Sequence, residues 1–486
     1  MLLKGTLYAA AVVVGAFYFA RIRSPRLRQV FLLIASYALY LTWGVWFAGA
    51  LLLSTVANFL LGSWLGRRNS AGVLWLGIVF NLGLLGVFKY LPPVAVSLPF
   101  SSLQRFSHLA LPLGISFWSF QAMSYLFDLY RGDELDPTFL EFALYMVFFP
   151  VAISGPICRL PGMLPQFRSE QTVPRAALGE GVRRIAIGIL MMQVARLLGQ
   201  GILSGDGISS GFDRPTAWSG PDVWCLAFGY GFQLFFDFAG YSHIAIGMAK
   251  MLGITVPENF ARPFASATPS IFWTRWHMSL SFWIRDYVFL PLATARREIW
   301  WRNLTLVLSM IVFGVWHNAT WLFVLWGCYH GVLLVLHRQV QQLQRRIDWE
   351  PPEGLWNVLS WLATAVLISL GWVFFRATSL SRAGQMLSAV LSPASYSSHV
   401  LTGSLYALVS LLGGGYFLVI LIAAALDRHS AESAAGTASR PTGMMSLLAE
   451  KRWFWLPPLY ALALLLVLIV TLTQGASTAQ LMYRQF

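Results

Sequence analysis

The sequence predicts an all-α protein that crosses a membrane several times. Of its 486 residues, 57% are hydrophobic and 11% are charged, and the mean hydropathy is +0.63. A soluble globular protein carries roughly 25% charged residues, so this chain cannot cover a soluble surface of its size. Apolar and polar residues do not alternate as they do in strands, and helices are then the element that can satisfy its own backbone inside a bilayer.

The basic residues explain the net charge of +14 without a nucleic-acid partner. They cluster between apolar runs, for example at 21–28, 67–68 and 158–184. Cytoplasmic loops of membrane proteins carry such an excess of Lys and Arg. We therefore expect these three loops to be cytoplasmic, the N-terminus to lie outside, and no nucleic acid to bind.

The apolar segments predict a polytopic protein, because about 20 apolar residues span a bilayer. We expect spans at about 5–20, 29–47, 48–66, 73–90, 113–130, 138–157, 185–204, 221–254, 357–375, 403–426 and 454–473. Prolines predict a loop or a re-entrant entry at 91–112 and irregular chain at 255–270. Residues 339–347 predict an interfacial helix, and residues 427–452 a mobile loop. Together with the hairpin described below, this gives one membrane domain over 1–486, with roughly eleven to thirteen helical segments.

The stretch from 270 to 331 is the candidate active-site region. Among its aromatic residues it holds three histidines together with Arg275, Arg285 and Asp286. Ionisable groups at membrane depth are costly, and where they occur they usually face an interior cavity and carry a function. His317 falls near the turn of a hairpin whose two ends, at 302 and 338, are basic. We therefore expect His317 to lie deep in the membrane.

An imidazole can act as a general base near neutral pH. His277 comes 40 positions before His317, and no nucleophilic Ser or Cys turn accompanies either residue. We therefore expect direct transfer, in which a base activates a hydroxyl that attacks an acyl donor without a covalent enzyme intermediate. His330 is 13 positions after His317. On one continuous helix that is a rotation of about 220°, which predicts that the two rings point to different faces.

Other interpretations of these histidines are open. A histidine in a membrane helix is often a hydrogen-bond partner for another helix, and for His330 and His243 we favour that interpretation. For His277 and His317 the structural and the catalytic interpretations are both open. None of the eight histidines has the HxxH or HxxxH spacing of di-iron membrane oxygenases, so we expect no metal site.

Several short segments, taken in order, resemble the membrane-bound O-acyltransferase family. The resemblance is to its bacterial branch, which contains the alginate O-acetylation protein and the teichoic acid D-alanyltransferase. The segments lie between 81 and 331, within an expected motif-bearing core of 81–383. They include NLGLLGVFKY at 81–90, LPLGISF at 111–117, FFP at 148–150, FDFAGYS at 236–242, PENF at 257–260, FWTRWH at 272–277, RDY at 285–287 and WH at 316–317. GWVFFRA at 371–377 is more similar to the polysaccharide O-acetyltransferases.

The resemblance implies a fold and a reaction. The fold is a ring of transmembrane or re-entrant helices around a central funnel, in a multi-pass protein of the bacterial inner membrane. His317 matches the catalytic histidine and His277 the second motif residue. An acyl group, most simply acetyl, is expected to pass from a cytoplasmic thioester to a hydroxyl of an extracytoplasmic polysaccharide. The thioester, acetyl-CoA or an acyl carrier protein, is a co-substrate, and no bound cofactor is expected.

The substrate-binding residues that we expect surround the two histidines in the sequence. They are Asp237, Tyr241, Asn259, Arg275, Trp276, Arg285, Asp286, Trp316 and Asn318. We expect Arg275, Arg285 and Asp286 to set the geometry and the donor entrance. The pair Arg285–Asp286 can equally be structural. Trp276 and Trp316 are expected to line the site.

Two residues depart from the family pattern. Asn318 stands where Gly or Ala is common, and His243 where Asp is common. Asn318 is expected to alter the acceptor pocket, and His243 adds a titratable group that an ion pair can explain. Two other functions stay open. One is a D-alanyl transferase fed by a carrier protein. The other is a passive acyl conduit for a periplasmic acyltransferase partner.

Overall fold

The computed structural model describes residues 2–434, apart from 20, 22, 98–105, 108, 171, 203–204, 215–217 and 350–352. The predicted span at 454–473 and residues 435–452 of the predicted mobile loop lie outside this part. Helices dominate the described residues, and the one β contact among them is an isolated bridge between Phe260 and Trp276. The prediction of an all-α protein is confirmed for this part of the chain.

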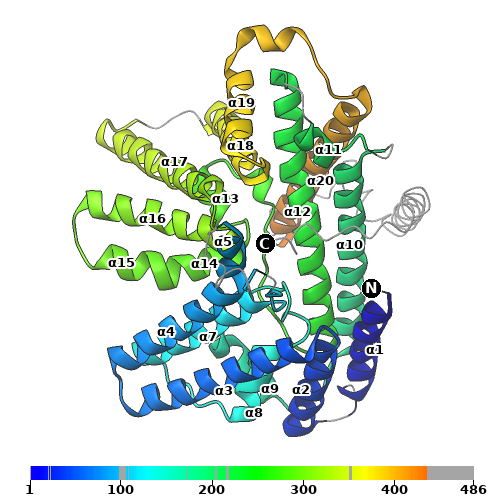
Figure 1. The fold of residues 1–486 in the computed structure, drawn as a ribbon. Helices are drawn as coiled ribbons and strands as arrows, with labels where there is room; N and C mark the ends of the chain where they lie inside the picture. The colour runs from blue at the N-terminus through cyan, green and yellow to red at the C-terminus, as the bar shows by residue number, and fades with distance from the viewer. Residues whose placement is uncertain are drawn as a thin grey trace. The chain divides into compact units, whose positions relative to one another are not determined.

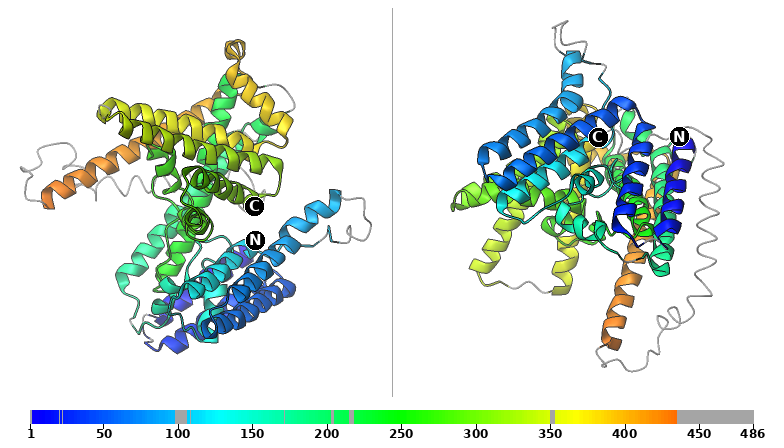
Figure 2. Two further views of the ribbon diagram at one scale, coloured as in Figure 1. Left: turned by 90° about the vertical axis from the view of Figure 1, so that its left-hand side faces the viewer. Right: turned by 90° about the horizontal axis from the view of Figure 1, so that it is seen from below.

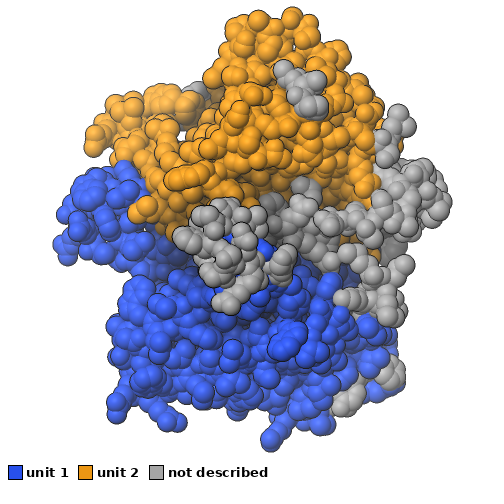
Figure 3. Space-filling view, viewed as in Figure 1, with its two compact units in different colours: residues 1–188, 241–260, 276–305 blue, residues 189–240, 261–275, 306–486 orange. Residues whose placement is uncertain are grey.

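The chain divides into two compact units, which Figure 3 colours separately. The first unit comprises residues 1–188, 241–260 and 276–305. The second comprises residues 189–240, 261–275 and 306–486. His277 therefore belongs to the first unit and His317 to the second.

The helices of the described chain are labelled in Figure 1. Up to residue 200 they are α1 (Leu2–Phe19), α2 (Pro25–Leu41), α3 (Val45–Arg67), α4 (Ala71–Leu85), η1 (Gly86–Tyr90), α5 (Leu91–Ser97), α7 (Ile115–Arg131), α8 (Phe139–Val147), α9 (Leu160–Phe167) and α10 (Arg175–Gln200). The next are α11 (Ile208–Asp213), α12 (Gly220–Met251), η2 (Pro263–Ala265), α13 (Pro269–Trp273), α14 (Met278–Ile284), η3 (Arg285–Phe289) and α15 (Leu290–Thr294). The last are α16 (Ile299–His317), α17 (Trp321–Arg346), α18 (Glu353–Arg376), α19 (Leu380–Leu391), η4 (Pro393–Ser397) and α20 (Gly403–Ala434).

In the first unit α3, α4 and α7 pack against one another, as Figure 1 shows in blue and cyan. Two fully buried asparagines join α3 to α4. Asn58 donates to Oδ1 of Asn81 at 3.1 Å, and Asn81 donates to Oδ1 of Asn58 at 2.7 Å. Polar side chains bond across membrane helices in this way, since an unsatisfied amide in an apolar surrounding is costly. In the second unit α17 and α18 run side by side (Figure 2).

Five described helices are long and apolar enough to cross a membrane. They are Val45–Arg67, Ala71–Pro93, Ile299–His317, Trp321–Arg346 and Leu355–Arg376. A shorter apolar helix covers Gly403–Leu418. The chain is therefore a helical membrane protein, and the ring of eleven to thirteen helices stays a prediction.

Two predicted element boundaries near prolines differ from the structure. Residues 91–97 form the helix α5 and not a loop, because α4 continues into it through the π-helical η1, and one candidate span runs from Ala71 to Pro93. The predicted span at 138–157 holds only the nine-residue α8, followed by turns. Pro150 cannot donate to a continuing helix and disfavours helical backbone at the residue before it.

Three further segments differ from their predictions. The turn between α2 and α3 lies at residues 42–44, several residues before the predicted boundary at 47–48. The predicted loop 158–184 contains α9 and the first turns of α10. Residues 339–347 are not a separate interfacial helix, because α17 continues unbroken to Arg346. Local apolar spacing marks helical segments, and it does not distinguish a new helix from the end of a long one.

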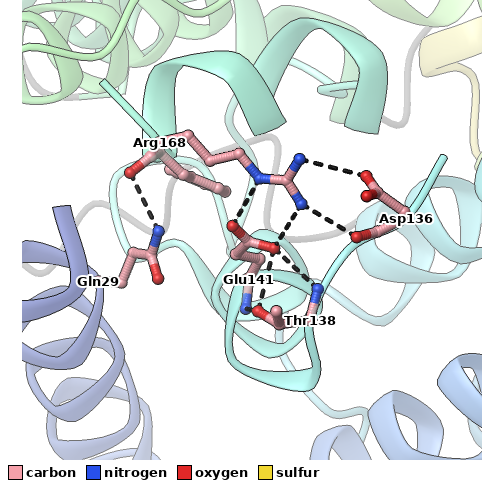
Figure 4. A network of polar contacts seen from close by, with 6 residues as sticks. Gln29, Asp136, Thr138, Glu141 and Arg168 are labelled. Carbon is pink, nitrogen blue, oxygen red and sulfur yellow. Dashed lines mark hydrogen bonds and ion pairs between the residues drawn. The ribbon is translucent and has the colours of Figure 1, made fainter. Parts of the chain in front are cut away.

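Arg168 directly follows α9 and links the end of that helix to the start of α8 through the network in Figure 4. Its guanidinium contacts both carboxylate oxygens of Glu141, at 2.8 and 3.0 Å, and the carboxylate of Asp136 at 3.2 Å. Glu141 also accepts from the backbone of Thr138 at 2.8 Å, which completes a capping box at the start of α8. Gln29 of α2 donates to the Phe167 carbonyl at 3.1 Å. These contacts join α2, α8 and α9.

Glu141→Gln is expected to lower the stability of the detergent-solubilised protein by about 1–3 kcal/mol, because it removes the charge of a buried carboxylate that pairs with Arg168 through two contacts. The value should fall toward the lower end, since Arg168 reaches solvent. Thermal unfolding measures it. The control is Asp136→Asn, whose side chain is 85% exposed and which should cost under about 0.5 kcal/mol. If Glu141→Gln and Asp136→Asn lower the stability equally, the contact between Glu141 and Arg168 is not the stabilising one.

Candidate functional site

In the second unit His317 is the last residue of α16, and its side chain lies in an aromatic enclosure. Residues 318–320 separate α16 from α17, so the hairpin turns where the sequence predicts. The imidazole is buried and lies almost parallel to the Phe313 ring, one helical turn earlier, at a centroid distance of 5.5 Å. Phe375 of α18 approaches it edge-on at 5.1 Å, and Trp326 of α17 at 5.9 Å. Three helices therefore fix this ring.

Glycines allow α16 and α17 to approach closely enough to build this enclosure. A Cβ atom at Gly314 would overlap the Phe323 carbonyl oxygen, and one at Gly327 the Met310 carbonyl oxygen. Small residues permit such backbone contact between membrane helices. Because the two backbones touch here, Trp326 on α17 lies against His317 on α16.

His330 shares Trp326 with His317. Its ring is fully buried, 4.9 Å from the Trp326 ring and 5.2 Å from that of Trp273. The prediction that His317 and His330 point to different faces is wrong, since it assumed one continuous helix and the chain reverses between them. Among the described residues neither ring nitrogen of His330 has a hydrogen-bond partner. The hydrogen-bond interpretation of His330 is therefore wrong within this part of the chain.

The other predicted residues of the second unit differ in exposure. Asp237 of α12 is buried, and Trp316 is buried with its ring 4.6 Å from that of His317. Arg275 donates to the Ala265 carbonyl at 3.3 Å. Asn318 is exposed in the turn. The structure thus brings Trp316 against His317, the predicted base, and leaves Asn318 exposed in the turn between α16 and α17.

In the first unit His277 precedes α14 in a left-handed conformation, with φ 43° and ψ 52°. It is 1% exposed and lies outside the five candidate spans. Burial lowers the pKa of the His277 imidazole to about 3, so the ring is neutral at pH 7. A neutral imidazole can accept a hydrogen bond, which positioning a substrate requires, whereas a pKa so far below 7 makes it a weak proton carrier at neutral pH.

The neighbours of His277 in the first unit are hydrogen-bonded to Asn259. The Met278 N–H donates to the Asn259 carbonyl at 2.9 Å, and the Ser279 hydroxyl donates to its Oδ1 at 2.6 Å. Trp276 is buried against Phe260, with the two rings 5.1 Å apart. Tyr241 is partly buried on α12. The predicted residues Asn259, Trp276 and His277 therefore form one cluster.

His243 has the helix–helix hydrogen bond that was predicted. Arg184 of α10 contacts its Nδ1 at 3.2 Å and also contacts Glu258 at 3.1 Å. This bond joins α10 to α12 within the first unit, beside the loop that carries Asn259. The departure from the family at position 243 thus has a structural role here.

Arg285 and Asp286 belong to a larger charged cluster in the first unit. Asp286 accepts from Arg285 at 2.6 Å and from Arg159 at 2.8 Å. Burial alone would raise the pKa of the Asp286 carboxyl, yet the hydrogen bonds and charges of the two arginines lower it below its ordinary value. Tyr287 donates to Asp128 at 2.7 Å. The Arg285–Asp286 ion pair is therefore present, and its role, structural or in binding, stays a prediction.

A cavity of about 460 Å³ opens beside this cluster. Arg159, Arg285, Asp286 and Tyr287 line it, and so does Ser279, two residues after His277. The sequence interpretation missed Arg159, which it assigned only to a basic loop, and it missed Phe313. The i, i+4 spacing of Phe313 and His317 was the available signal for the latter. No group of three or more His, Cys, Asp or Glu within the described residues could hold a metal ion.

Comparison with known proteins identifies the family. Residues 59–376 match the membrane-bound O-acyltransferase family. The chain belongs to this family. Its members transfer acyl groups, so the chain is an acyltransferase, and the matched region runs from α3 to the end of α18. The resemblance stated from the short motifs is confirmed.

Named relatives are similar over most of the chain. A protein of Azotobacter vinelandii, "Probable alginate O-acetylase AlgI", is 35% identical over 382 residues, which cover 76% of this chain and 73% of that protein. The "Peptidoglycan O-acetyltransferase" of Helicobacter pylori is 32% identical over 406 residues, covering 76% and 75%. The "Teichoic acid D-alanyltransferase" of Streptococcus thermophilus is 33% identical over 271 residues, covering 50% and 63%.

Gly371→Ala is expected to lower acyl transfer roughly 10- to 100-fold, the effect of a misplacement of about 1 Å in a catalytic site. A Cβ atom there would overlap Nε2 of His330. The α18 helix must then move from α17 and carry Phe375 away from His317. Ester formed per amount of membrane protein measures the effect. Gly384→Ala in α19 is the control, because nothing lies within 4 Å of its new Cβ. Full activity of Gly371→Ala would show that acyl transfer does not depend on the packing of α18 and Phe375 beside His317.

Proposed function

We propose that this acyltransferase transfers an acetyl group from a cytoplasmic thioester to a hydroxyl of an extracytoplasmic polysaccharide, with His317 as general base. The observation that carries the proposal is the buried imidazole of His317 at the helix break, enclosed by Phe313, Trp326 and Phe375. Two relatives named for O-acetylation of alginate and peptidoglycan, both glycans, support the acceptor class.

The proposed reaction needs no covalent enzyme intermediate. His317 takes the proton of the acceptor hydroxyl, and the acceptor oxygen attacks the thioester carbonyl carbon. The carbon–sulfur bond breaks, and the proton passes from His317 to the departing thiolate. The aromatic walls exclude bulk water, which limits hydrolysis of the thioester. Of the two roles predicted for His277, positioning a substrate is the one that suits its lowered pKa.

The cavity of the first unit is the proposed donor entrance. Thioester donors such as acetyl-CoA and acyl carrier proteins carry phosphate groups on the pantetheine arm, and Arg is well suited to bind phosphate. Arg285 lines the cavity with 54% of its side chain exposed, so it can reach a phosphate at the mouth. The basic loop containing Arg159 is one of the three that the charge rule assigns to the cytoplasm.

D-alanyl transfer from a carrier protein is the second candidate. The D-alanyltransferase of Streptococcus thermophilus matches half of this chain, whereas the two O-acetylating relatives match 76% of it. This difference favours acetyl transfer to a polysaccharide. We place the protein as a multi-pass protein of the bacterial inner membrane, in contact with lipid. Its partners are the donor or its carrier protein, and the polysaccharide or a periplasmic acyltransferase that receives the acyl group.

His317→Ala is expected to reduce glycan ester by roughly 10²–10⁴-fold, the usual contribution of a general base. The measurement is acetate released by mild base from the glycan of a deletion strain complemented at matched membrane levels. His277→Ala should also lower the ester. His399→Ala is the control, since His399 is exposed in a loop. Near wild-type ester in His317→Ala would contradict the base assignment and support a passive conduit.

Arg285→Ala is expected to raise the KM for acetyl-CoA by roughly tenfold with little change in kcat, the loss of one charge-assisted hydrogen bond of about 1.5 kcal/mol. Initial rates with purified protein in proteoliposomes measure both constants. The control is Arg345→Ala, an equal charge change at the exposed end of α17. An unchanged KM in Arg285→Ala would place the donor elsewhere.

A further inference from the structure

Asn259 is the hub of a buried hydrogen-bond network in the first unit. Its side chain is fully buried. The amide nitrogen donates to the hydroxyl of Ser242 on α12 at 3.0 Å, and the amide oxygen accepts from the hydroxyl of Ser279 on α14 at 2.6 Å. An asparagine amide supplies a donor and an acceptor on one short side chain. Asn259 uses both inside the protein.

The network holds the backbone on both sides of His277. Before it, Trp276 forms the bridge with Phe260, and after it the Met278 N–H donates to the Asn259 carbonyl. His277 itself is in the left-handed region, which costs a residue other than glycine of the order of 1 kcal/mol or more. Such a conformation persists only where its surroundings over-determine it, and residues 259–260 provide that restraint.

The same network reaches the wall of the donor cavity. The Ser279 hydroxyl that donates to Asn259 also accepts from the Ile157 N–H at 3.0 Å, and both Ser279 and Ile157 line the cavity. Arg184 holds the adjacent Glu258 and so anchors the loop from the α10 side. One residue therefore connects the conformation of His277, through its backbone carbonyl, to the shape of the cavity, through its side-chain amide.

We propose that Asn259 is a positioning residue, which holds His277 in its left-handed conformation and Ser279 in the cavity wall. This differs from the substrate contact that the sequence suggested for Asn259. Its effect on the reaction rests on the proposed function, because it acts through His277 and the donor cavity. Its effect on the backbone does not depend on that function.

Activity distinguishes positioning from substrate contact. Asn259→Ala is expected to lower kcat roughly 10- to 100-fold through His277 and to raise the KM for acetyl-CoA only a few-fold, because Ser279 keeps its bond from the Ile157 N–H in the cavity wall. Ser279→Ala should reproduce part of this loss, and the double variant should lose less than the product of the two single losses. If Asn259→Ala raises the KM and leaves kcat unchanged, the proposal is overturned. It is also overturned if Ser279→Ala is fully active and the loss of the double variant equals the product of the losses of the two single variants.

Hydrogen–deuterium exchange gives a readout that does not require activity. In Asn259→Ala the peptide covering 277–284 should exchange faster. The Met278 N–H keeps the carbonyl of residue 259 as its acceptor, but that carbonyl is no longer held in place by the side-chain bonds to Ser242 and Ser279. Peptides of α3 and α4 should be unchanged. Asn69→Ala is the matched control, an exposed asparagine of the same unit that donates to the Tyr130 carbonyl. Its kcat and its exchange at 277–284 should equal the wild type. Unchanged exchange of that peptide in Asn259→Ala would overturn the proposal.

The two proposals fail differently. If wild-type protein transfers no acetyl group to a polysaccharide but Asn259→Ala speeds exchange at 277–284, the function is wrong and the restraint on His277 stands. If wild type is active and Asn259→Ala changes neither kcat nor exchange, the function stands and the positioning role is wrong.

Discussion

The backbone contact between α16 and α17 is the constraint on which the His317 site depends. Gly314 and Gly327 bring each helix against a carbonyl oxygen of the other. The aromatic side chains of α17 can then reach the end of α16 and enclose the imidazole. In a membrane, where apolar surface is not driven together by water, this kind of close packing replaces hydrophobic burial as the source of order. A larger residue at either glycine would open the enclosure.

The first unit is organised by polar contacts, although most of its residues are apolar. Asn58 with Asn81, Arg168 with Glu141, and Asn259 with Ser242 and Ser279 each join helices or loops that are distant in the chain. Each polar group that leaves water must find a partner, so these few pairs specify which segments meet. The loop with Asn259 joins α12 to α14 through such bonds, directly beside the strained backbone of His277.

The four histidines near the motifs have different surroundings. His243 bonds Arg184 and joins two helices. His330 is enclosed by aromatic rings and by Gly371. His277 has a left-handed backbone beside a cavity wall, and His317 ends a helix inside an aromatic enclosure. Burial separates the partly buried His243 from the other three but does not distinguish those three from one another. The backbone position of each residue and the type of its contacts do.

The sequence by itself determined the helical membrane class, the helix break after His317 and the family. These follow from composition, from segment length and from short motifs in order, all of which are local. It did not determine that α5 continues through Pro92 and Pro93, or that α8 ends early. It also did not determine that His317 and His330 share Trp326, or that Arg159 binds Asp286. Those facts depend on which distant segments pack together, and only the tertiary structure decides that, because a side chain's partner is chosen by position in space and not by spacing along the chain.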